Sequence, residues 1–152
     1  MTTQVDKIAD WFINRVDRDS GEAITHLKLQ KLLYFAQAWH LANKGEPLFD
    51  AEFQAWAHGP VTRPIYDRFK GQGWDALEAV DPPKLSKKVE NYLEKVFETY
   101  GKYGAKYLER LTHKHAPWIE ARGDAAPEER CETVISKKSM RDYYGQKIGK
   151  DW

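Results

Sequence analysis

The sequence predicts a mainly α protein of about six or seven helices, with a small β-sheet of two or three strands. Three observations lead to this prediction. Apolar residues recur at helical spacing along most of the 152 residues. Strict alternation of apolar and polar side chains is confined to the stretch around residues 49–57. Glycine and proline fall between the periodic segments, where they end helices and form turns.

The longest helical pattern covers Thr25 to Lys44, and the rest of the chain is arranged around it. Apolar side chains occupy most of its circumference, so we expect this helix to be buried among neighbours. Thr25 has a hydroxyl that can cap the first turn, and Gly45 suits the left-handed residue that commonly ends a helix. Lys28 and Lys31 make the segment too charged to span a membrane.

On either side of this helix the pattern predicts shorter elements. A helix is expected over Thr3–Asp17, before a loop at residues 19–21. Alternation over Phe49–Ala57 predicts a half-buried strand, which His58-Gly59-Pro60 should end because proline lacks a backbone donor. A helix is then expected from about Thr62 to Lys70.

The second half of the chain is predicted to be helical, with one further short strand. Gly71–Pro83 is rich in glycine and proline and is expected to be the main loop. Glu132–Ile135 is β-branched and is expected to pair with the strand formed by Glu52–Ala57. The expected helices are Leu85–Tyr100, Ala105–His113, a turn over Pro117–Arg122 and a last short helix over Met140–Ile148.

Composition predicts one domain over residues 1–152 in the cytoplasm. The length suits a single core, and the formal net charge of +1 gives no overall attraction to nucleic acid or an anionic membrane. A single cysteine, Cys131, fits a reducing compartment. The first residues lack the basic and apolar segments of a signal peptide, so we expect a cytoplasmic protein.

Residues that could carry chemistry are few, and we expect no catalytic, cofactor-binding or metal-binding residues. His113 and His115 stand two apart at a helix end, which is not the spacing of a zinc site. Cys131 has no surrounding nucleophile motif. A small metal-dependent hydrolase that uses His113, His115 and carboxylates remains the enzymatic alternative.

Two basic stretches of the sequence could together form a surface for nucleic acid. Lys84, Lys87 and Lys88 precede one helix, and residues 137–141 begin another. Acidic residues are interspersed with them, and no DNA-binding or RNA-binding motif is present. We therefore do not expect nucleic acid as a partner, and the lysines are expected to lie on solvated faces.

Two blocks give a resemblance to a known family. ITHLKLQKLLYFAQAW (Ile24–Trp39) and FQAWAHGPVTRPIYDRFK (Phe53–Lys70) closely resemble the Panacea domain, also called the SocA-like antitoxin domain. YGKYGAKYLERLTHKHAPWIEAR (Tyr100–Arg122) is similar to a later block of the same family, and Ile135–Tyr144 fits its end. The resemblance covers most of the chain.

The resemblance implies a function in protein binding rather than catalysis. Members of the family occur in bacteria and phages as the neutralising half of toxin–antitoxin pairs. The implied partner is a cognate protein toxin encoded by an adjacent gene, which is neutralised by direct binding. One alternative is an adaptor that delivers its bound partner to a cytoplasmic protease. An orphan phage protein without a toxin is another. The resemblance implies no membrane as a binding partner.

The partner-binding residues expected from the motifs include the polar members of the long helix and the turn near His58. The leucines of the LKLQKLLY block are expected to form core. The His58-Gly59-Pro60-Val61 segment is favoured as a scaffold that fixes the turn, and the alternative places it on the toxin-binding face. Trp74 is expected to be exposed in the main loop. The full set of expected contacts is Lys28, Gln30, Lys31, Trp56, His58, Arg63, Tyr66 and Trp74.

Overall fold

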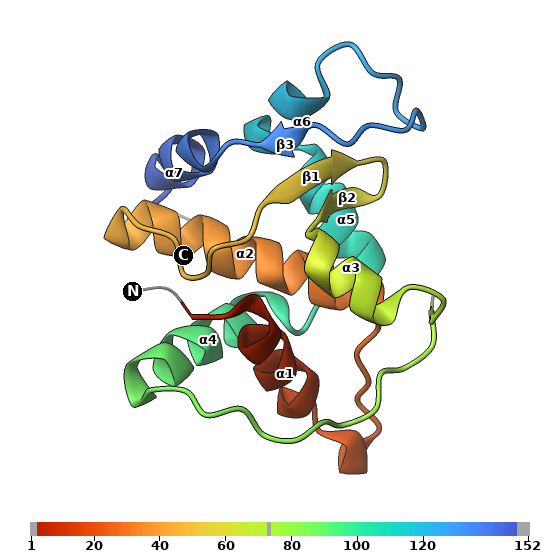
Figure 1. Cartoon of the computed structure of the whole chain (residues 1–152), viewed down its shortest axis with the longest axis vertical. Helices are drawn as coiled ribbons and strands as arrows, with labels where there is room; N and C mark the ends of the chain where they lie inside the picture. Colours follow the sequence, from red (N-terminus) through yellow and green to blue (C-terminus); the bar gives the residue numbers. More distant parts are fainter. Residues whose placement is uncertain (1–2, 73, 149–152) are drawn as a thin grey trace.

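The computed structural model of the chain describes residues 3–72 and 74–148. Within these ranges it has seven α-helices, one short 3-10 helix and a three-stranded antiparallel sheet, which confirms the predicted mainly α class (Figure 1). The helices are α1 (Val5–Arg15), α2 (His26–Lys44), α3 (Arg63–Phe69), α4 (Lys87–Tyr100), α5 (Ala105–His113), α6 (Ala116–Arg122) and α7 (Lys137–Gly145), with the 3-10 helix η1 (Arg18–Ser20). The strands are β1 (Phe53–Trp56), β2 (Gly59–Val61) and β3 (Val134–Ile135).

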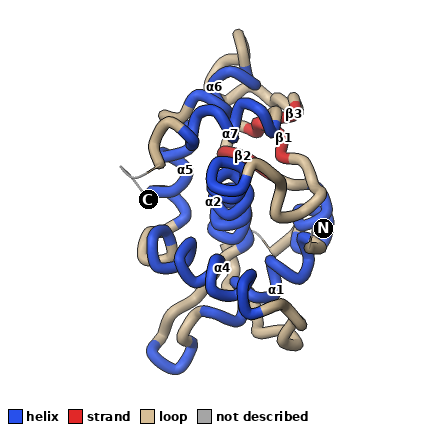
Figure 2. Tube along the Cα trace, turned by 90° about the vertical axis from the view of Figure 1, so that its left-hand side faces the viewer, coloured by secondary structure: helices blue, strands red, loops and turns tan. Residues whose placement is uncertain are grey.

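The long helix α2 runs through the centre, and the other elements surround it (Figures 1 and 2). Both predicted caps are confirmed. The Thr25 hydroxyl accepts a hydrogen bond from the Lys28 N–H at 3.2 Å, and Gly45 adopts a left-handed φ of 75°. Most side chains of α2 are buried, as the apolar circumference predicted.

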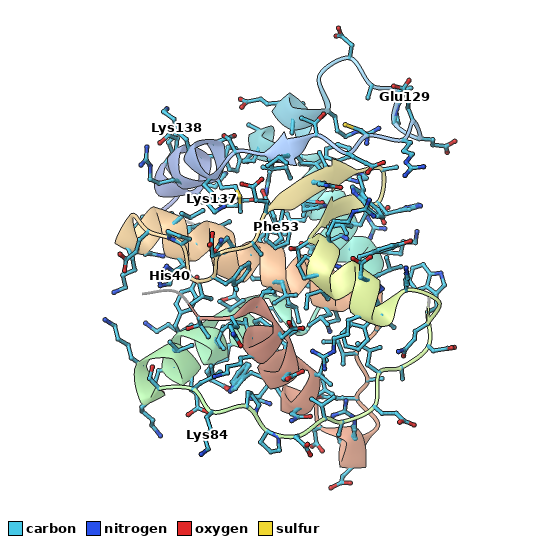
Figure 3. The ribbon with its side chains drawn as sticks, viewed as in Figure 1. His40, Phe53, Lys84, Glu129, Lys137 and Lys138 are labelled. Carbon is cyan, nitrogen blue, oxygen red and sulfur yellow. The ribbon has the colours of Figure 1, made fainter. Side chains whose placement is uncertain are left out.

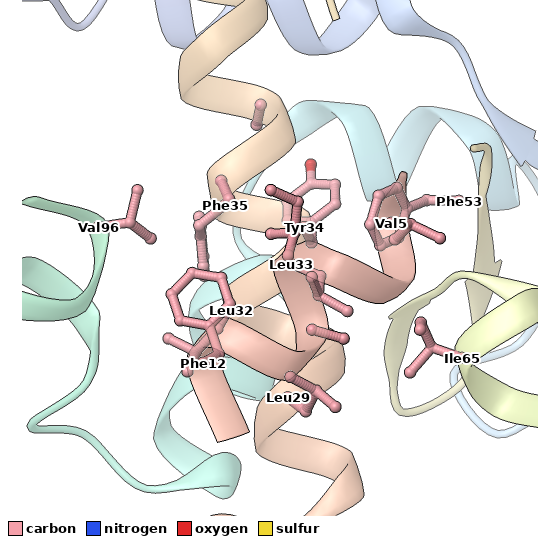
Figure 4. Packing of buried hydrophobic residues seen from close by; sticks show 14 of the residues in the cluster. Val5, Phe12, Leu29, Leu32, Leu33, Tyr34, Phe35, Phe53, Ile65 and Val96 are labelled. Carbon is pink, nitrogen blue, oxygen red and sulfur yellow. The ribbon is translucent and has the colours of Figure 1, made fainter. Parts of the chain in front are cut away.

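The core forms where α1, α4, β1 and α3 pack against α2. Figure 4 shows this cluster of apolar side chains from elements far apart in the sequence. Phe12 of α1, Val96 of α4 and Ile65 of α3 are buried beside the leucines of α2. Of the four leucines in the LKLQKLLY block, Leu29, Leu32 and Leu33 are fully buried, in agreement with the expectation that they form core, whereas Leu27 is only half-buried.

The sheet has the order β2-β1-β3, and the pairing of β1 with β3 confirms one sequence prediction. Phe53 lies opposite Ile135, so the β-branched segment does pair with the alternating one. The other pairing was not predicted. The chain reverses at residues 57–58, and Gly59–Val61 returns as strand β2 beside β1. Pro60 is tolerated there because β2 lies at the edge of the sheet.

Two further segments differ from expectation at their ends. The last helix, α7, covers Lys137–Gly145 and so begins and ends earlier than the predicted helix over Met140–Ile148. The predicted strand over Phe49–Ala57 is shorter, because β1 begins only at Phe53. Phe49 instead forms an isolated parallel bridge with Thr3.

In the part of the chain that the structure describes, no helix is long and apolar enough to cross a membrane.

Candidate partner-binding surface

Four of the expected contact residues line one recess in the surface, with a volume of about 390 Å³. Trp56 lies at the end of β1, His58 in the turn of the β1–β2 hairpin, and Arg63 and Tyr66 on the first turns of α3. The opposite wall is the loop of residues 128–132, between α6 and β3. We call this the hairpin recess.

The hairpin recess is held by contacts between its aromatic and cationic side chains. The rings of Trp56 and Tyr66 meet edge to face, with their centroids 4.8 Å apart. The Arg63 guanidinium lies 5.5 Å from the centroid of the Trp56 ring, within the range of a cation–π interaction. The Trp56 indole N–H donates to the side-chain oxygen of Gln54 at 2.8 Å, which fixes the orientation of the ring.

The loop wall joins the recess through ion pairs. Arg63 Nη2 lies 3.3 Å from Glu132 Oε1, and Arg130 Nη2 lies 2.7 Å from Glu132 Oε2. The loop itself is fixed by Arg122, a buried residue at the end of α6. Arg122 Nη1 donates to the Ala55 carbonyl at 2.9 Å, and Nη2 donates to the Glu129 carbonyl at 2.8 Å. The guanidinium thus bridges strand β1 and the loop.

The residues around the recess provide both charges and aromatic surface. The imidazole of His58 is 70% exposed and lies 3.4 Å from a carboxylate oxygen of Glu109 on α5. Arg63 is about half exposed, and Trp56 and Tyr66 are half-buried. Tryptophan, tyrosine and arginine are the side chains that most often dominate binding energy at protein interfaces. The recess therefore carries the residue types that are common at protein interfaces.

Gln30 lies beneath this surface and not on it. It is 1% exposed. Its side-chain oxygen accepts from the Thr62 N–H at 2.9 Å, and its amide nitrogen lies 3.0 Å from His26 Nε2. Burial lowers the pKa of His26 to about 4, so the ring is neutral near pH 7. Gln30 therefore ties α2 to the start of α3, and its expected contact with a partner does not fit its burial.

Lys31 is also buried, at 1% exposure, which likewise does not fit the expected contact. Its ammonium Nζ has no hydrogen-bond partner among the residues that the structure describes. Burial lowers its pKa from 10.5 to about 8, opposed by the charge of Glu109. The lysine chain packs under Gly59, where a Cβ atom would come within 2.5 Å of Lys31 Cε. Gly59 also has a φ of 105°, so both space and conformation require glycine.

The remaining two expected residues lie away from the hairpin recess. Lys28 Nζ donates to the Gly101 carbonyl at 2.5 Å, which fixes the connection between α4 and α5. Trp74 lies in the loop between α3 and α4, is 58% exposed, and has Lys106 Nζ 5.3 Å from its ring centroid. The structure thus brings four of the eight expected residues into one site.

The two histidines of the hydrolase alternative face different surroundings. The His113 ring stacks on Trp118 with centroids 4.0 Å apart, and burial lowers its pKa. His115 Nδ1 lies 2.7 Å from the Tyr144 hydroxyl. Over residues 3–72 and 74–148, no group of three or more histidine, cysteine, aspartate or glutamate side chains is placed to hold a metal ion.

The basic stretches do not join into one patch. Figure 3 shows Lys84 at one end of the molecule, and Lys137 and Lys138 on α7 toward the other end. Lys138 is moreover paired with Asp142 at 2.7 Å. The two lysine clusters therefore do not form a continuous surface for a nucleic-acid backbone.

Sequence reasoning missed the residues of the loop wall. Arg130 and Glu132 come from a polar segment without periodicity that is far from Trp56 in the sequence. Arg122, which fixes this loop, falls in the predicted helical turn over Pro117–Arg122, where no local pattern marks its contact with Ala55. The one available signal was the expected pairing of the segment starting at Glu132 with β1, which brings this end of the loop to the hairpin.

A mainly α fold in which strand β1 and helix α3 present tryptophan, tyrosine and arginine around a recess fits the class of protein-binding domains. Residues 29–119, more than half of the chain, match the family described as antitoxin SocA-like, Panacea domain. The chain belongs to this family, which confirms the resemblance. The match includes the hairpin and α3 but ends before the loop wall.

A similar protein is Antitoxin SocA of Caulobacter vibrioides (strain NA1000 / CB15N), which is 32% identical over 109 residues. The aligned part is 62% of this chain and 58% of that relative, so the match spans less than two thirds of the relative's length. No solved structure gives a significant match to the chain.

Proposed function

We propose that this protein is an antitoxin that neutralises a cognate protein toxin by binding to it directly. The observation that carries the proposal is membership of the SocA-like antitoxin family across residues 29–119. The name of the relative, Antitoxin SocA, supports the same role. We further propose that the toxin is the product of an adjacent gene.

The hairpin recess is the proposed centre of the contact. Its side chains are held in place before a partner arrives, since Arg63 is paired with Glu132 and the Trp56 ring packs on Tyr66. Holding these groups in advance lowers the entropy cost of ordering them on binding. An interface of ordinary size covers roughly 800 Å² on each partner, so the contact would extend from the recess over the hairpin turn and the loop wall.

Neutralisation of this kind needs no reaction on the antitoxin. A toxin is inactivated when the bound protein covers its active site. We therefore propose that the protein is not an enzyme and that it needs no cofactor for this function.

The proposal is tested by expressing the chain together with the product of each flanking gene. We expect one product to stop growth alone, to be harmless when co-expressed, and to co-purify with this protein in a stoichiometric complex. Growth arrest that co-expression does not relieve, or the absence of any complex, would rule out direct neutralisation. A toxin that disappears faster when this protein is present would instead favour the adaptor for a cytoplasmic protease.

Arg63→Glu tests whether the hairpin recess is the binding surface. The substitution reverses the charge beside Trp56 and places a carboxylate near Glu132, so we expect toxin affinity to fall about tenfold or more. Titration calorimetry with the purified toxin measures the loss, and growth assays report the matching loss of rescue.

Arg141→Glu is the matched control for this experiment. The Arg141 side chain is 48% exposed and paired with a neighbouring carboxylate, against 46% for Arg63. It lies on α7, outside the recess. Both variants should unfold within about 0.5 kcal/mol of the parent protein. Equal toxin affinities for the two variants would show that the recess is not the contact.

A further inference from the structure

Trp74 belongs to a second exposed surface, separate from the hairpin recess. This surface combines the loop after α3 with the start of α5 and the turn that precedes it. We call it the aromatic–basic strip and define it by Trp74, Lys102, Tyr103, Lys106 and Tyr107. Trp74 is 58% exposed and Tyr107 is 42% exposed, so two large aromatic side chains face solvent here.

Contacts between the aromatic and basic side chains make the strip continuous. Lys106 Nζ lies 5.3 Å from the ring centroid of Trp74, and Lys102 Nζ lies 5.3 Å from that of Tyr103. The rings of Tyr103 and Tyr107 stack at 4.2 Å. The strip therefore combines one lysine over Trp74 with a second lysine over the stacked pair of tyrosines. Each aromatic ring also limits the freedom of the lysine that lies over it.

The strip carries a local excess of positive charge that the protein itself does not neutralise. Lys102 and Lys106 are exposed, and neither has an ion-pair partner among residues 3–72 and 74–148. Arg110, one turn beyond Lys106, is exposed as well. Two acidic residues lie nearby, since Asp75 follows Trp74 in the sequence and Glu98 lines a recess together with Lys102, Tyr103 and Tyr107. Glu109 is turned toward His58 at 3.4 Å. Lys102, Lys106 and Arg110 therefore still outnumber the two nearby carboxylates.

From this arrangement we infer that the aromatic–basic strip is a docking surface for an acidic, leucine-bearing segment of a protein partner. Carboxylates of the segment pair with Lys102 and Lys106, and its apolar side chains cover the exposed parts of Trp74 and Tyr107. Such an anchor, an exposed tryptophan flanked by unpaired cations, fits an acidic partner by charge complementarity. The inference does not depend on the proposed function of the hairpin recess.

The ring contacts favour a protein over single-stranded nucleic acid. Proteins that bind single strands stack successive bases on open aromatic faces. Here an ammonium group lies over Tyr103 and another over Trp74, and Tyr103 and Tyr107 are stacked on each other. The faces that bases would need are therefore partly occupied. The edges of the rings and the ammonium groups remain accessible to a peptide.

Fluorescence anisotropy with three defined probes tests this inference. The probes are a short labelled peptide that alternates glutamate and leucine, the same peptide with glutamine in place of glutamate, and a labelled oligothymidine. We expect the glutamate peptide to bind the full chain most tightly and to weaken as the salt concentration rises. Equal binding of the glutamine peptide, no binding of any peptide, or tighter binding of oligothymidine would overturn the inference.

The double variant Lys102→Glu/Lys106→Glu locates the contact. We expect it to weaken binding of the glutamate peptide about tenfold, because two attractive contacts become repulsive. Lys84→Glu/Lys87→Glu is the matched control, since both lysines are exposed and lie outside the strip. An equal loss in the two double variants would show that only net charge matters and would overturn the inference.

Two single variants complete the test. Trp74→Ala should also weaken binding of the glutamate peptide about tenfold. It should leave the melting temperature of the protein unchanged, because the Trp74 side chain is mostly exposed. Arg63→Glu, in the hairpin recess, should leave peptide binding unchanged. The two variants distinguish the two surfaces. Trp74→Ala and the glutamate peptide report on the aromatic–basic strip, whereas Arg63→Glu and the toxin report on the hairpin recess. Peptide binding that survives Trp74→Ala would place the docking surface elsewhere.

Discussion

At the scale of single residues, Lys31 has the clearest energetic consequence. It is a fully buried lysine without a hydrogen-bond partner among the described residues, and such groups oppose folding. Its pKa of about 8 in the folded state against the ordinary 10.5 corresponds to a cost of about 3 kcal/mol when the amine is charged. The charge of Glu109 offsets part of the desolvation of the ammonium.

Lys31→Met is expected to stabilise the protein by about 1–3 kcal/mol at pH 7, because methionine keeps an unbranched apolar chain and removes the buried charge. The folded-state pKa lies below the unfolded one, so the unfolded chain binds more protons between pH 8 and 10.5. Stability of the parent protein should therefore rise with pH across this window, relative to the variant. Urea unfolding at several pH values measures both effects.

Lys44→Met, at the exposed end of the same helix, is the control for this prediction. It should change the free energy of unfolding by no more than about 0.5 kcal/mol. If Lys31→Met were less stable than the parent at pH 7, or followed the same pH dependence, the buried charge would not be the cost described above.

At the scale of elements, Arg122 connects α6 to the loop wall of the recess. The loop has no helix or strand of its own over residues 123–133. Its carbonyls at Ala126 and Glu129 accept hydrogen bonds from Arg122 Nη2, while the Ala55 carbonyl accepts from Nη1. The guanidinium also lies 5.1 Å from the Trp118 ring centroid. The planar guanidinium therefore donates to backbone carbonyls that would pair with backbone N–H groups if the loop were a strand.

Arg122→Leu is expected to destabilise the protein by about 2–4 kcal/mol, because the buried Ala55 carbonyl loses its donor and the partly buried bonds to the loop carbonyls are lost as well. Hydrogen exchange should show faster exchange across residues 124–133, with α2 little affected. Arg122→Lys keeps the charge but lacks the planar fork, so we expect an intermediate loss. Unchanged exchange in the loop after Arg122→Leu would mean that the loop is ordered by other contacts.

At the scale of the whole molecule, α7 ties the C-terminal part of the described chain to the central helix. Tyr144 of α7 is fully buried, and its ring centroid lies 5.2 Å from that of Trp39 on α2. Its hydroxyl bonds to His115 at 2.7 Å and to Tyr34 at 3.3 Å. The contacts with Trp39 and Tyr34 join segments more than a hundred residues apart, so the loss of one side chain affects the entire core.

Tyr144→Ala is expected to lower the free energy of unfolding by about 3–5 kcal/mol, through the cavity it leaves against α2. That loss is a large part of the stability typical of a domain of this size. Tyr144→Phe keeps the ring and loses only the hydroxyl bonds, so about 1–2 kcal/mol is expected. Urea unfolding followed by tryptophan fluorescence compares the two. A similar loss in both would assign the stability to the hydroxyl rather than to packing.

Local patterns predicted most of the elements correctly. The caps of α2 at Thr25 and Gly45, the position of the main loop and the β-branched character of the segment that forms β3 follow from side chains close to one another in sequence. Helical periodicity and capping are local, because they depend on residues a few positions apart. The family blocks are equally local, and they were sufficient to place the chain among SocA-like antitoxins.

By itself, the sequence determined the mainly α class, the central helix and the family. Only the tertiary structure decided which polar residues of that helix face solvent. Gln30 and Lys31 are buried because the β1–β2 hairpin and α5 cover them, and these elements lie about 30 to 80 residues further along the chain. The wall of the hairpin recess was decided in the same way, by Arg122 reaching Ala55. Burial and site assembly depend on such distant contacts, which no short sequence pattern encodes.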